Sequence, residues 1–200
     1  MNVILFLIQT SMISTMVLPD SFTKAGWGSV PMCTPKMEVC PIKTDTFFGT
    51  WYEIARTPSK VSNNLTCIAT TFKNNSLSHD NLFFVTSVGL NITSTSNFTL
   101  SGNGTVIDPA KFRIDLPIYR DLLNKPNFIV RNVWVDLKGN YQRAVISSPN
   151  STNDESDSYY VLSRSKLMSQ IQLEAATKFA SQLNTSTQLD WVMTNQCDFW

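Results

Sequence analysis

The residues that could carry chemistry in this chain are few, and its cysteines are the most informative of them. Four are present, and their spacing does not fit a zinc site: Cys33, Cys40, Cys67 and Cys197. The only histidine is His79, so the sequence argues against metal chemistry and implies no cofactor. An even number of cysteines in a secreted chain predicts two disulfides, chosen from three pairings.

The amino-terminal segment and the asparagines predict secretion to the extracellular space. Residues 1–18 are apolar but broken by polar residues, and a bilayer-spanning helix needs about 20 apolar residues. We therefore expect a signal peptide over residues 1–25, cut between Pro19 and Ala25, with an uncleaved membrane anchor as the alternative. N-glycosylation is predicted at the Asn-x-Ser/Thr sites Asn64, Asn74, Asn91, Asn97, Asn103, Asn150 and Asn184.

Charge excludes one class of partner. The formal net charge is +1, without a long basic or acidic run, whereas a nucleic-acid surface needs clustered Lys and Arg. Residues 26–47 form an arm that three prolines make too punctuated for regular structure. We expect one domain over residues 48–200 to follow the arm.

The domain has the two-residue alternation of β-strands. In the first strand this places Trp51, Glu53 and Ala55 on one face and Tyr52, Ile54 and Arg56 on the other. A turn at Asn103-Gly104 closes the fourth strand, and Gly139-Asn140 predicts a hairpin between the sixth and seventh. The predicted strands cover residues 48–56, 67–72, 82–90, 97–101, 112–116, 128–135, 141–148 and 159–164.

The period then changes to that of a helix. Apolar residues recur three or four apart from Leu167 to Leu183, and Ser169-x-x-Gln172 has the form of a capping box. This predicts a helix over about residues 169–184, before a last short strand at 190–194 within a terminal segment of residues 189–200.

Strand number and order favour an all-β fold: an eight-stranded antiparallel up-and-down β-barrel over residues 48–164, with one C-terminal α-helix packed outside. Closure of the sheet removes the exposed edges of an open one, and a barrel of this size holds one small ligand. A two-sheet sandwich fits the same alternation.

Three motifs give this fold a family resemblance. Gly49-Thr-Trp51-Tyr-Glu-Ile-Ala resembles the opening strand of the lipocalins, and within them apolipoprotein D and the insect bilin-binding proteins. Asp136 to Tyr141 is similar to the family's turn between the sixth and seventh strands, although Val135 replaces its threonine and one residue is inserted. Tyr160-Val-Leu-Ser-Arg164 is similar to the closing strand. The resemblance implies that Trp51 plugs the barrel floor and Arg164 lies across its indole ring.

The resemblance also implies a ligand site inside the barrel. The family's pocket aromatics fall on Phe72 and Tyr160, and alternation adds Ala55 and Leu162. On the sixth strand we expect Phe128, Val130 and Trp134 to face inward, because the opposite choice would put the charge of Arg131 in the cavity. Core packing is the structural alternative for each of these residues.

The implied function is binding and transport of a small hydrophobic molecule: a fatty acid, steroid, retinoid, carotenoid or tetrapyrrole. The resemblance to apolipoprotein D implies a Cys67–Cys197 disulfide, which leaves Cys33–Cys40. One lipocalin is an isomerase with a cavity thiol, so an enzyme using Cys67 is an alternative. The other is a filled barrel that binds a cell-surface receptor.

Overall fold

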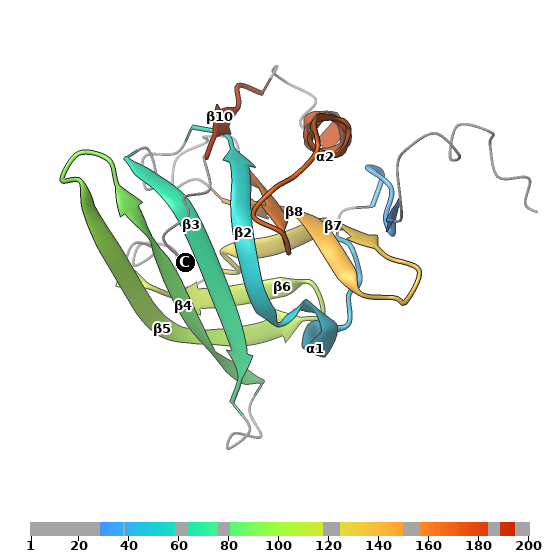
Figure 1. Ribbon diagram of the computed structural model, residues 1–200. Helices are drawn as coiled ribbons and strands as arrows, with labels where there is room; N and C mark the ends of the chain where they lie inside the picture. The colour runs from blue at the N-terminus through green and yellow to red at the C-terminus, as the bar shows by residue number, and fades with distance from the viewer. Residues whose placement is uncertain are drawn as a thin grey trace, which may run out of the picture.

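The chain folds into a closed antiparallel barrel with a helix against its outside (Figure 1). The computed structural model describes residues 29–37, 39–58, 64–75, 81–117, 125–149, 157–183 and 189–194. Each barrel strand pairs with the next one along the chain, and β9 returns to pair with β2. The predicted up-and-down barrel is confirmed, and the sandwich alternative is wrong. The barrel strands are β2 (Gly49–Arg56), β3 (Leu65–Asn74), β4 (Leu82–Asn91), β5 (Ser96–Asp108), β6 (Lys111–Asp115), β7 (Phe128–Val135), β8 (Tyr141–Ser148) and β9 (Ser158–Ser163).

Two sequence predictions about regular structure are wrong. The arm contains β1 (Val30–Pro31), which pairs with the end of β7, and the one-turn helix α1 (Thr44–Phe47). Asn103-Gly104 is no turn, because β5 continues through it to Asp108. A Cβ atom on Gly104 would lie 2.2 Å from the Phe83 ring of the neighbouring strand, so the glycine makes room for an aromatic side chain inside the sheet.

Two register shifts reverse the side-chain alternation. On β2, pairing with β9 shifts between Glu53 and Ala55. On β7, pairing with β8 shifts between Val130 and Asn132. A β-bulge inserts one extra residue, so the side chains beyond it change faces relative to a regular strand.

The apolar side chains form two separate clusters on the two sides of the barrel wall. The aromatic core lies inside and brings five phenylalanine rings to centroid distances of 5.4 to 6.1 Å: Phe47, Phe72, Phe83, Phe112 and Phe128. The helix cluster lies outside, where Leu173, Ala176, Phe179 and Ala180 of α2 (Gln170–Leu183) pack on the barrel. The interior is therefore partly filled by its own aromatic rings.

Helix α2 begins as predicted. The Ser169 amide donates to Gln172 Oε1 at 3.2 Å, and the Gln172 amide donates to Ser169 Oγ at 3.4 Å, which is a capping box. Strand β10 (Val192–Met193) then pairs with β2 at Arg56 and Ala55. Neither helix of the described chain is both long and apolar enough to cross a membrane.

The floor of the barrel is closed by Arg164 and Trp51. The guanidinium carbon lies 3.8 Å from the centre of the Trp51 ring, so the predicted cation–π contact is confirmed. Arg164 Nη1 donates to the carbonyl of Thr50, and Nη2 donates to the carbonyls of Thr46, Phe47 and Phe48 at 2.8 to 3.1 Å.

Gly49 is required at this floor for two reasons. Its φ is +106°, which favours glycine, and a Cβ atom there would lie 3.1 Å from Arg164 Nη1. Burial lowers the pKa of Arg164 to about 10, which leaves the group charged at neutral pH.

The β7–β8 hairpin is not closed by a two-residue turn. Val135 pairs with Tyr141, and a loop over residues 136–140 joins the two strands. Asp136 Oδ1 accepts from the amides of Lys138 and Asn140, and Oδ2 accepts from the side chain of Gln142. These hydrogen bonds, chiefly those with Asn140, lower the pKa of Asp136. Tyr141 is buried, and its hydroxyl accepts from the Lys43 amide at 2.9 Å, which ties the hairpin to the arm.

Candidate ligand-binding cavity

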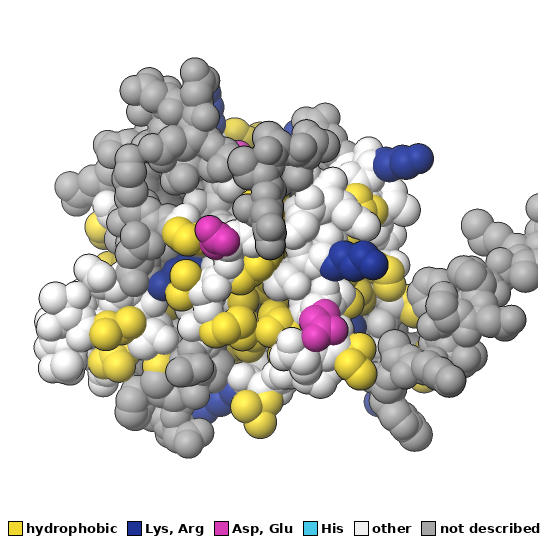
Figure 2. All heavy atoms as spheres, turned by 90° about the horizontal axis from the view of Figure 1, so that it is seen from above, with side chains coloured by type: hydrophobic (Ala, Val, Ile, Leu, Met, Phe, Trp, Pro, Cys, Tyr) yellow, Lys and Arg dark blue, Asp and Glu magenta, His cyan; other side chains and the backbone are white. Residues whose placement is uncertain are grey.

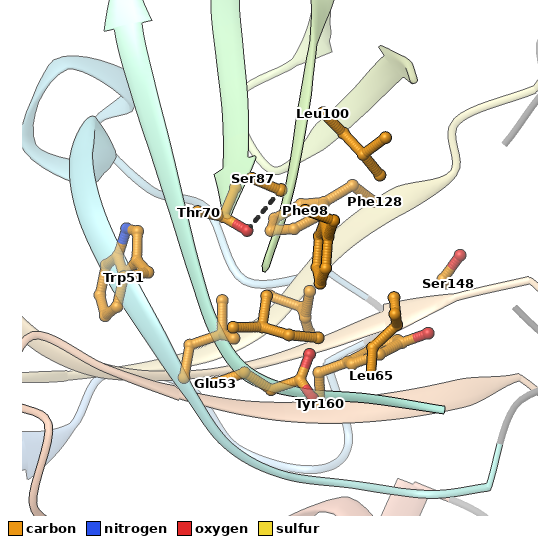
Figure 3. A pocket seen from close by; sticks show the side chains of 13 residues that line it. Trp51, Glu53, Leu65, Thr70, Ser87, Phe98, Leu100, Phe128, Ser148 and Tyr160 are labelled. Atoms are coloured by element: carbon orange, nitrogen blue, oxygen red, sulfur yellow. Dashed lines mark hydrogen bonds between the residues drawn. The ribbon is translucent and has the colours of Figure 1, made fainter. Parts of the chain in front are cut away.

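An internal cavity of about 60 Å³ lies between β2, β3, β4, β5 and the β7–β9 side of the barrel (Figure 3). Its wall is mostly apolar, with a few polar groups set into it. Figure 2 shows apolar side chains gathered at the centre of the face seen from above, with acidic and basic side chains beside them. The lining residues are Trp51, Glu53, Leu65, Ile68, Thr70, Ser87, Phe98, Leu100, Phe128, Ile146, Ser148, Tyr160 and Leu162.

Three of the seven predicted ligand-binding residues line this cavity: Phe128, Tyr160 and Leu162. Phe72 and Val130 also lie inside the barrel, but they belong to the aromatic core and do not line the cavity. The sequence therefore located the interior side of β9 and of the start of β7. Whether these residues contact a ligand stays a prediction.

The predicted inward orientation of Ala55 and Trp134 is wrong. Both belong to the helix cluster, and the Trp134 ring lies 6.0 Å from that of Phe179 and 5.2 Å from the Arg143 guanidinium. Each residue follows one of the two register shifts, which turn it from the barrel interior to the side covered by α2.

The charge argument that placed Arg131 outside the cavity is confirmed. Its Nε donates to Ser147 Oγ at 2.8 Å, and Nη2 lies 3.0 Å from Asp157 Oδ2. On β7, alternation therefore assigned Phe128 and Val130 correctly to the interior. It was wrong only for Trp134, which lies beyond the register shift.

Several lining residues were not predicted as ligand contacts. Ile68 and Thr70 share the inner face of β3 that the sequence analysis assigned to Phe72, so alternation was sufficient to find them. Phe98 and Leu100 alternate on β5 in the same way. The sequence pattern did not predict how the strands pair. That pairing brings the remaining residues to the cavity: Leu65, Ser87, Ile146 and Ser148.

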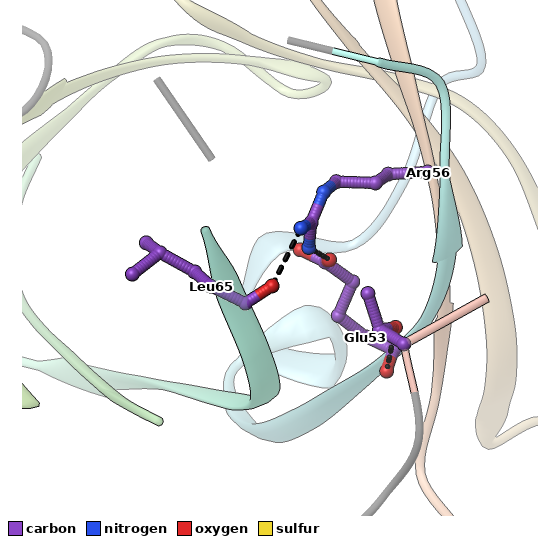
Figure 4. Close-up of polar contacts among 4 residues, drawn as sticks. Glu53, Arg56 and Leu65 are labelled. Carbon is purple, nitrogen blue, oxygen red and sulfur yellow. Dashed lines mark hydrogen bonds and ion pairs between the residues drawn. The ribbon is translucent and has the colours of Figure 1, made fainter. Parts of the chain in front are cut away.

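The missed residue with the most distinctive chemistry is Glu53. Glu53 lines the cavity and is 6% exposed, and Arg56 is 1% exposed. Arg56 Nη1 donates to Glu53 Oε1, and Nη2 donates to the carbonyl of Leu65, both at 2.5 Å (Figure 4). Burial raises the pKa of Glu53, and the charge and hydrogen bond of Arg56 oppose that rise.

The bulge in β2 explains why this ion pair exists. In regular alternation Glu53 and Arg56 would lie on opposite faces of the strand. The shift between Glu53 and Ala55 sends Ile54 and Ala55 to the helix cluster and returns Arg56 to the side of Glu53. Thr194 holds this irregular stretch, because its amide donates to the Ile54 carbonyl and its hydroxyl to the Glu53 carbonyl.

The other polar groups on the wall are neutral. The hydroxyls of Thr70 and Ser87 are 2.8 Å apart across β3 and β4, so they hydrogen-bond each other (Figure 3). Ser148 and the phenol of Tyr160 complete the polar set. An apolar cavity with a few placed polar groups is typical of a small-molecule site.

The cysteines bear on the enzyme alternative. Cys33 and Cys40 form the predicted disulfide in the arm. Cys67 is buried and disulfide-bonded, and it therefore holds no thiolate. Its predicted partner Cys197 lies outside the described residues, so that pairing stays a prediction. Among the described side chains, no three His, Cys, Asp or Glu residues group as metal ligands would.

The predicted glycosylation sites that the structure describes are accessible to different degrees. Asn64, Asn74, Asn97 and Asn103 are exposed, and Asn91 is half-buried. Asn150 and Asn184, like the predicted signal peptide, lie outside the described residues. Glycosylation stays a prediction, with solvent exposure in its favour at four sites.

A family model described as a lipocalin-like domain matches residues 42–194, which includes every strand of the barrel. The chain belongs to the lipocalin family. Among curated proteins, none matches this lipocalin in sequence.

Solved structures share the fold of this lipocalin at low identity. Lobster apocrustacyanin A1 is 17% identical with a TM-score of 0.56, covering 77% of this chain and 79% of that one. Insecticyanin from the tobacco hornworm Manduca sexta is 15% identical with a TM-score of 0.54, covering 86% and 91%. The cockroach allergen Per a 4 is 16% identical with a TM-score of 0.53, covering 76% and 87%.

Proposed function

We propose that this lipocalin is secreted and binds a small hydrophobic molecule in the barrel cavity, as a carrier. The observation that carries the proposal is the apolar cavity itself, which has one charged side chain on the wall among the described residues. The ligand classes are those that the family resemblance implies: a fatty acid, steroid, retinoid, carotenoid or tetrapyrrole. The disulfide between Cys33 and Cys40 is consistent with an oxidising, extracellular location.

The free volume sets a condition on this function. A cavity of about 60 Å³ holds roughly two water molecules, whereas pockets for drug-sized ligands enclose about 300 to 1,000 Å³. The aromatic core fills the interior beside the cavity. Binding therefore requires lining side chains to move, and the half-buried Phe98 of β5 is best suited, because it is not packed into that core.

The experiment that tests the proposal is native mass spectrometry of the secreted protein after removal of its glycans. A carrier retains a hydrophobic molecule, which appears as a mass above that of the polypeptide and disappears on denaturation. A panel of retinoic acid, a long-chain fatty acid, a steroid and a bilin then identifies the class by saturable binding.

The same small volume favours a second candidate, a filled-barrel lipocalin that acts by binding a cell-surface receptor. In that function the interior is structural and the outer surface carries recognition. No retained molecule and no saturable binding across the panel would support the filled barrel and contradict the carrier.

The thiol-isomerase alternative is less well supported than either. It needs Cys67 reduced and facing the cavity, whereas Cys67 is disulfide-bonded and does not line it. Alkylation of the denatured, unreduced protein followed by peptide mapping tests this directly. Labelled Cys67 would return the enzyme to consideration.

A further inference from the structure

The barrel interior is divided between the cavity and the aromatic core, and Phe128 lies at their boundary. Of the five phenylalanines of that core, Phe128 is the one that also lines the cavity. Its ring centre lies 5.4 Å from that of Phe72, 5.9 Å from that of Phe112 and 6.1 Å from that of Phe47. Figure 3 shows Phe128 and Trp51 among the side chains around the cavity. A ligand that moves toward the floor therefore meets Phe128 with a layer of rings behind it.

The rings behind Phe128 are closely packed. Phe47, Phe72 and Phe112 are only 0 to 1% exposed. The Phe47 carbonyl accepts a hydrogen bond from Arg164 Nη2 at 2.9 Å, which holds the helical turn that carries this ring. Rings at these distances are packed as densely as other protein interiors, so an added group would force strain into the core. The cavity therefore has a fixed inner end at Phe128.

The length of the cavity follows from strand β3, which runs along it. The lining residues of β3 extend from Leu65 to Thr70, and Phe72, the next residue on the same face, belongs to the aromatic core. A rise of about 3.3 Å per residue gives about 16 Å of strand, and a strand tilt of about 40° reduces this to about 12 Å along the barrel axis. That is about the length of an extended chain of ten carbons, with C–C bonds of about 1.5 Å. Methylene groups beyond this length remain outside the cavity.

We propose that this lipocalin selects compact hydrophobic ligands, with a chain of about ten carbons, and that Phe128 sets this limit by closing the inner end of the cavity. The proposal deepens the carrier function and rests on it. Among the classes named above, it favours medium-chain fatty acids and similar chains over carotenoids and tetrapyrroles, which are longer or broader than the cavity. Phe72 then supports the closed end from behind Phe128.

A series of primary alcohols tests the length limit on the unmodified protein. 1-Hexanol, 1-octanol, 1-decanol, 1-dodecanol and 1-tetradecanol compete with the fluorescent probe N-phenyl-1-naphthylamine. Within the cavity, each added methylene should tighten binding about fourfold, which is the gain from burying one CH₂ group. The rise should end near 1-decanol, and 1-tetradecanol should bind within about threefold of it, because the added methylenes stay in water. A cavity without this limit would give a difference on the order of 200-fold between those two alcohols.

Variants then assign the limit to Phe128. Phe128→Ala adds the space of the ring to the cavity, so 1-tetradecanol should bind about tenfold or more tighter than 1-decanol. Phe179→Ala is the matched control, because it removes the same ring at nearly the same exposure, 6% against 7%, from the helix cluster outside the barrel. The control should keep the wild-type limit. Phe128→Leu, a smaller loss of volume, should move the limit in the same direction as Phe128→Ala, and it replaces that variant if circular dichroism shows that the alanine protein does not fold.

The outcomes separate this inference from the function on which it rests. Binding that keeps tightening about fourfold per methylene up to 1-tetradecanol in the wild type overturns the inference and leaves the carrier standing. A limit that stays at 1-decanol in both Phe128 variants, or that moves equally in Phe179→Ala, overturns the role of Phe128. If neither the alcohols nor the probe binds, the carrier function fails and the inference fails with it.

Discussion

The buried Arg56 and the half-buried Arg164 lie toward opposite ends of the barrel, and they are stabilised in different ways. At the floor, Arg164 donates to four backbone carbonyls of residues 46–50 and stacks on Trp51. Beside the cavity, Arg56 donates to the Glu53 carboxylate and to the Leu65 carbonyl. The first arrangement fixes the backbone of a closed end, and the second leaves an anion on the wall of a cavity. The floor thus closes one end of the barrel, and the Glu53 end borders the proposed ligand cavity.

Removing the floor aromatic should give the largest effect. Trp51 is fully buried, contacts Phe47 at a ring distance of 4.9 Å and donates from Nε1 to the Phe47 carbonyl at 2.8 Å. Trp51→Ala should lower the free energy of unfolding by about 3 to 5 kcal/mol, because it leaves a large cavity. Urea denaturation followed by circular dichroism measures it. A loss below about 1 kcal/mol would show that the floor does not hold the barrel together.

Removing the floor arginine should cost less. Arg164→Ala leaves carbonyls that water can partly reach, so we expect a loss of about 2 to 3 kcal/mol in the same denaturation experiment. Arg164→Lys is the matched control. It keeps the charge but cannot reach several carbonyls at once, so its stability should fall between those of the wild type and the alanine variant. Equal stability of all three proteins would contradict the role given to the guanidinium fork.

A third change sharpens the comparison by opening the cavity. Phe98 is half-buried and lines the cavity from β5. Phe98→Ala should enlarge the cavity and raise the affinity for a bound probe about tenfold, because a larger share of molecules is then binding-competent. Phe84→Ala on β4, where the ring is 48% exposed, is the control and should change neither affinity nor stability. Unchanged affinity in Phe98→Ala would mean that Phe98 does not limit access.

The smallest effect concerns pH. Because burial raises the pKa of Glu53 in the folded state, the folded protein holds this proton more tightly than the unfolded chain does. Its contribution to stability is complete below the unfolded pKa and is lost as pH rises through the folded pKa, at no more than about 1.4 kcal/mol per pH unit. Denaturation series from pH 4 upward should show this slope in the wild type and not in Glu53→Gln. A wild type that gains stability relative to the variant over that interval would reverse the assigned direction.

The sequence predicted the parts of this structure that depend on local pattern. Strands β7 and β8, the capping box of α2 and the contact between Trp51 and Arg164 follow from periodicity and from the family motifs. The floor was predictable because each of its members belongs to a short motif with a fixed spacing.

The cavity was less predictable because its wall depends on two bulges. A single extra residue in β2 turns Ala55 outward and brings Arg56 to Glu53, and a second in β7 turns Trp134 to α2. Bulges arise from pairing with a neighbouring strand, which an alternation count along one strand cannot detect. The full length of β5 was not predicted for a related reason. The sequence analysis interpreted Gly104 as a turn signal, whereas the glycine makes room for the Phe83 ring.

The central claim, that a ligand occupies the cavity beside Glu53, is tested most directly by methyl-resolved NMR during a titration with 1-decanol. Ile68, Leu100 and Ile146 carry methyl groups on the cavity wall, whereas Ile54 and Leu173 report on the helix cluster outside the barrel. The proposed site predicts saturable shifts of the three cavity residues at one common dissociation constant, with the two outer residues unchanged. Shifts confined to Ile54 and Leu173, or no saturable shift at all, would contradict it.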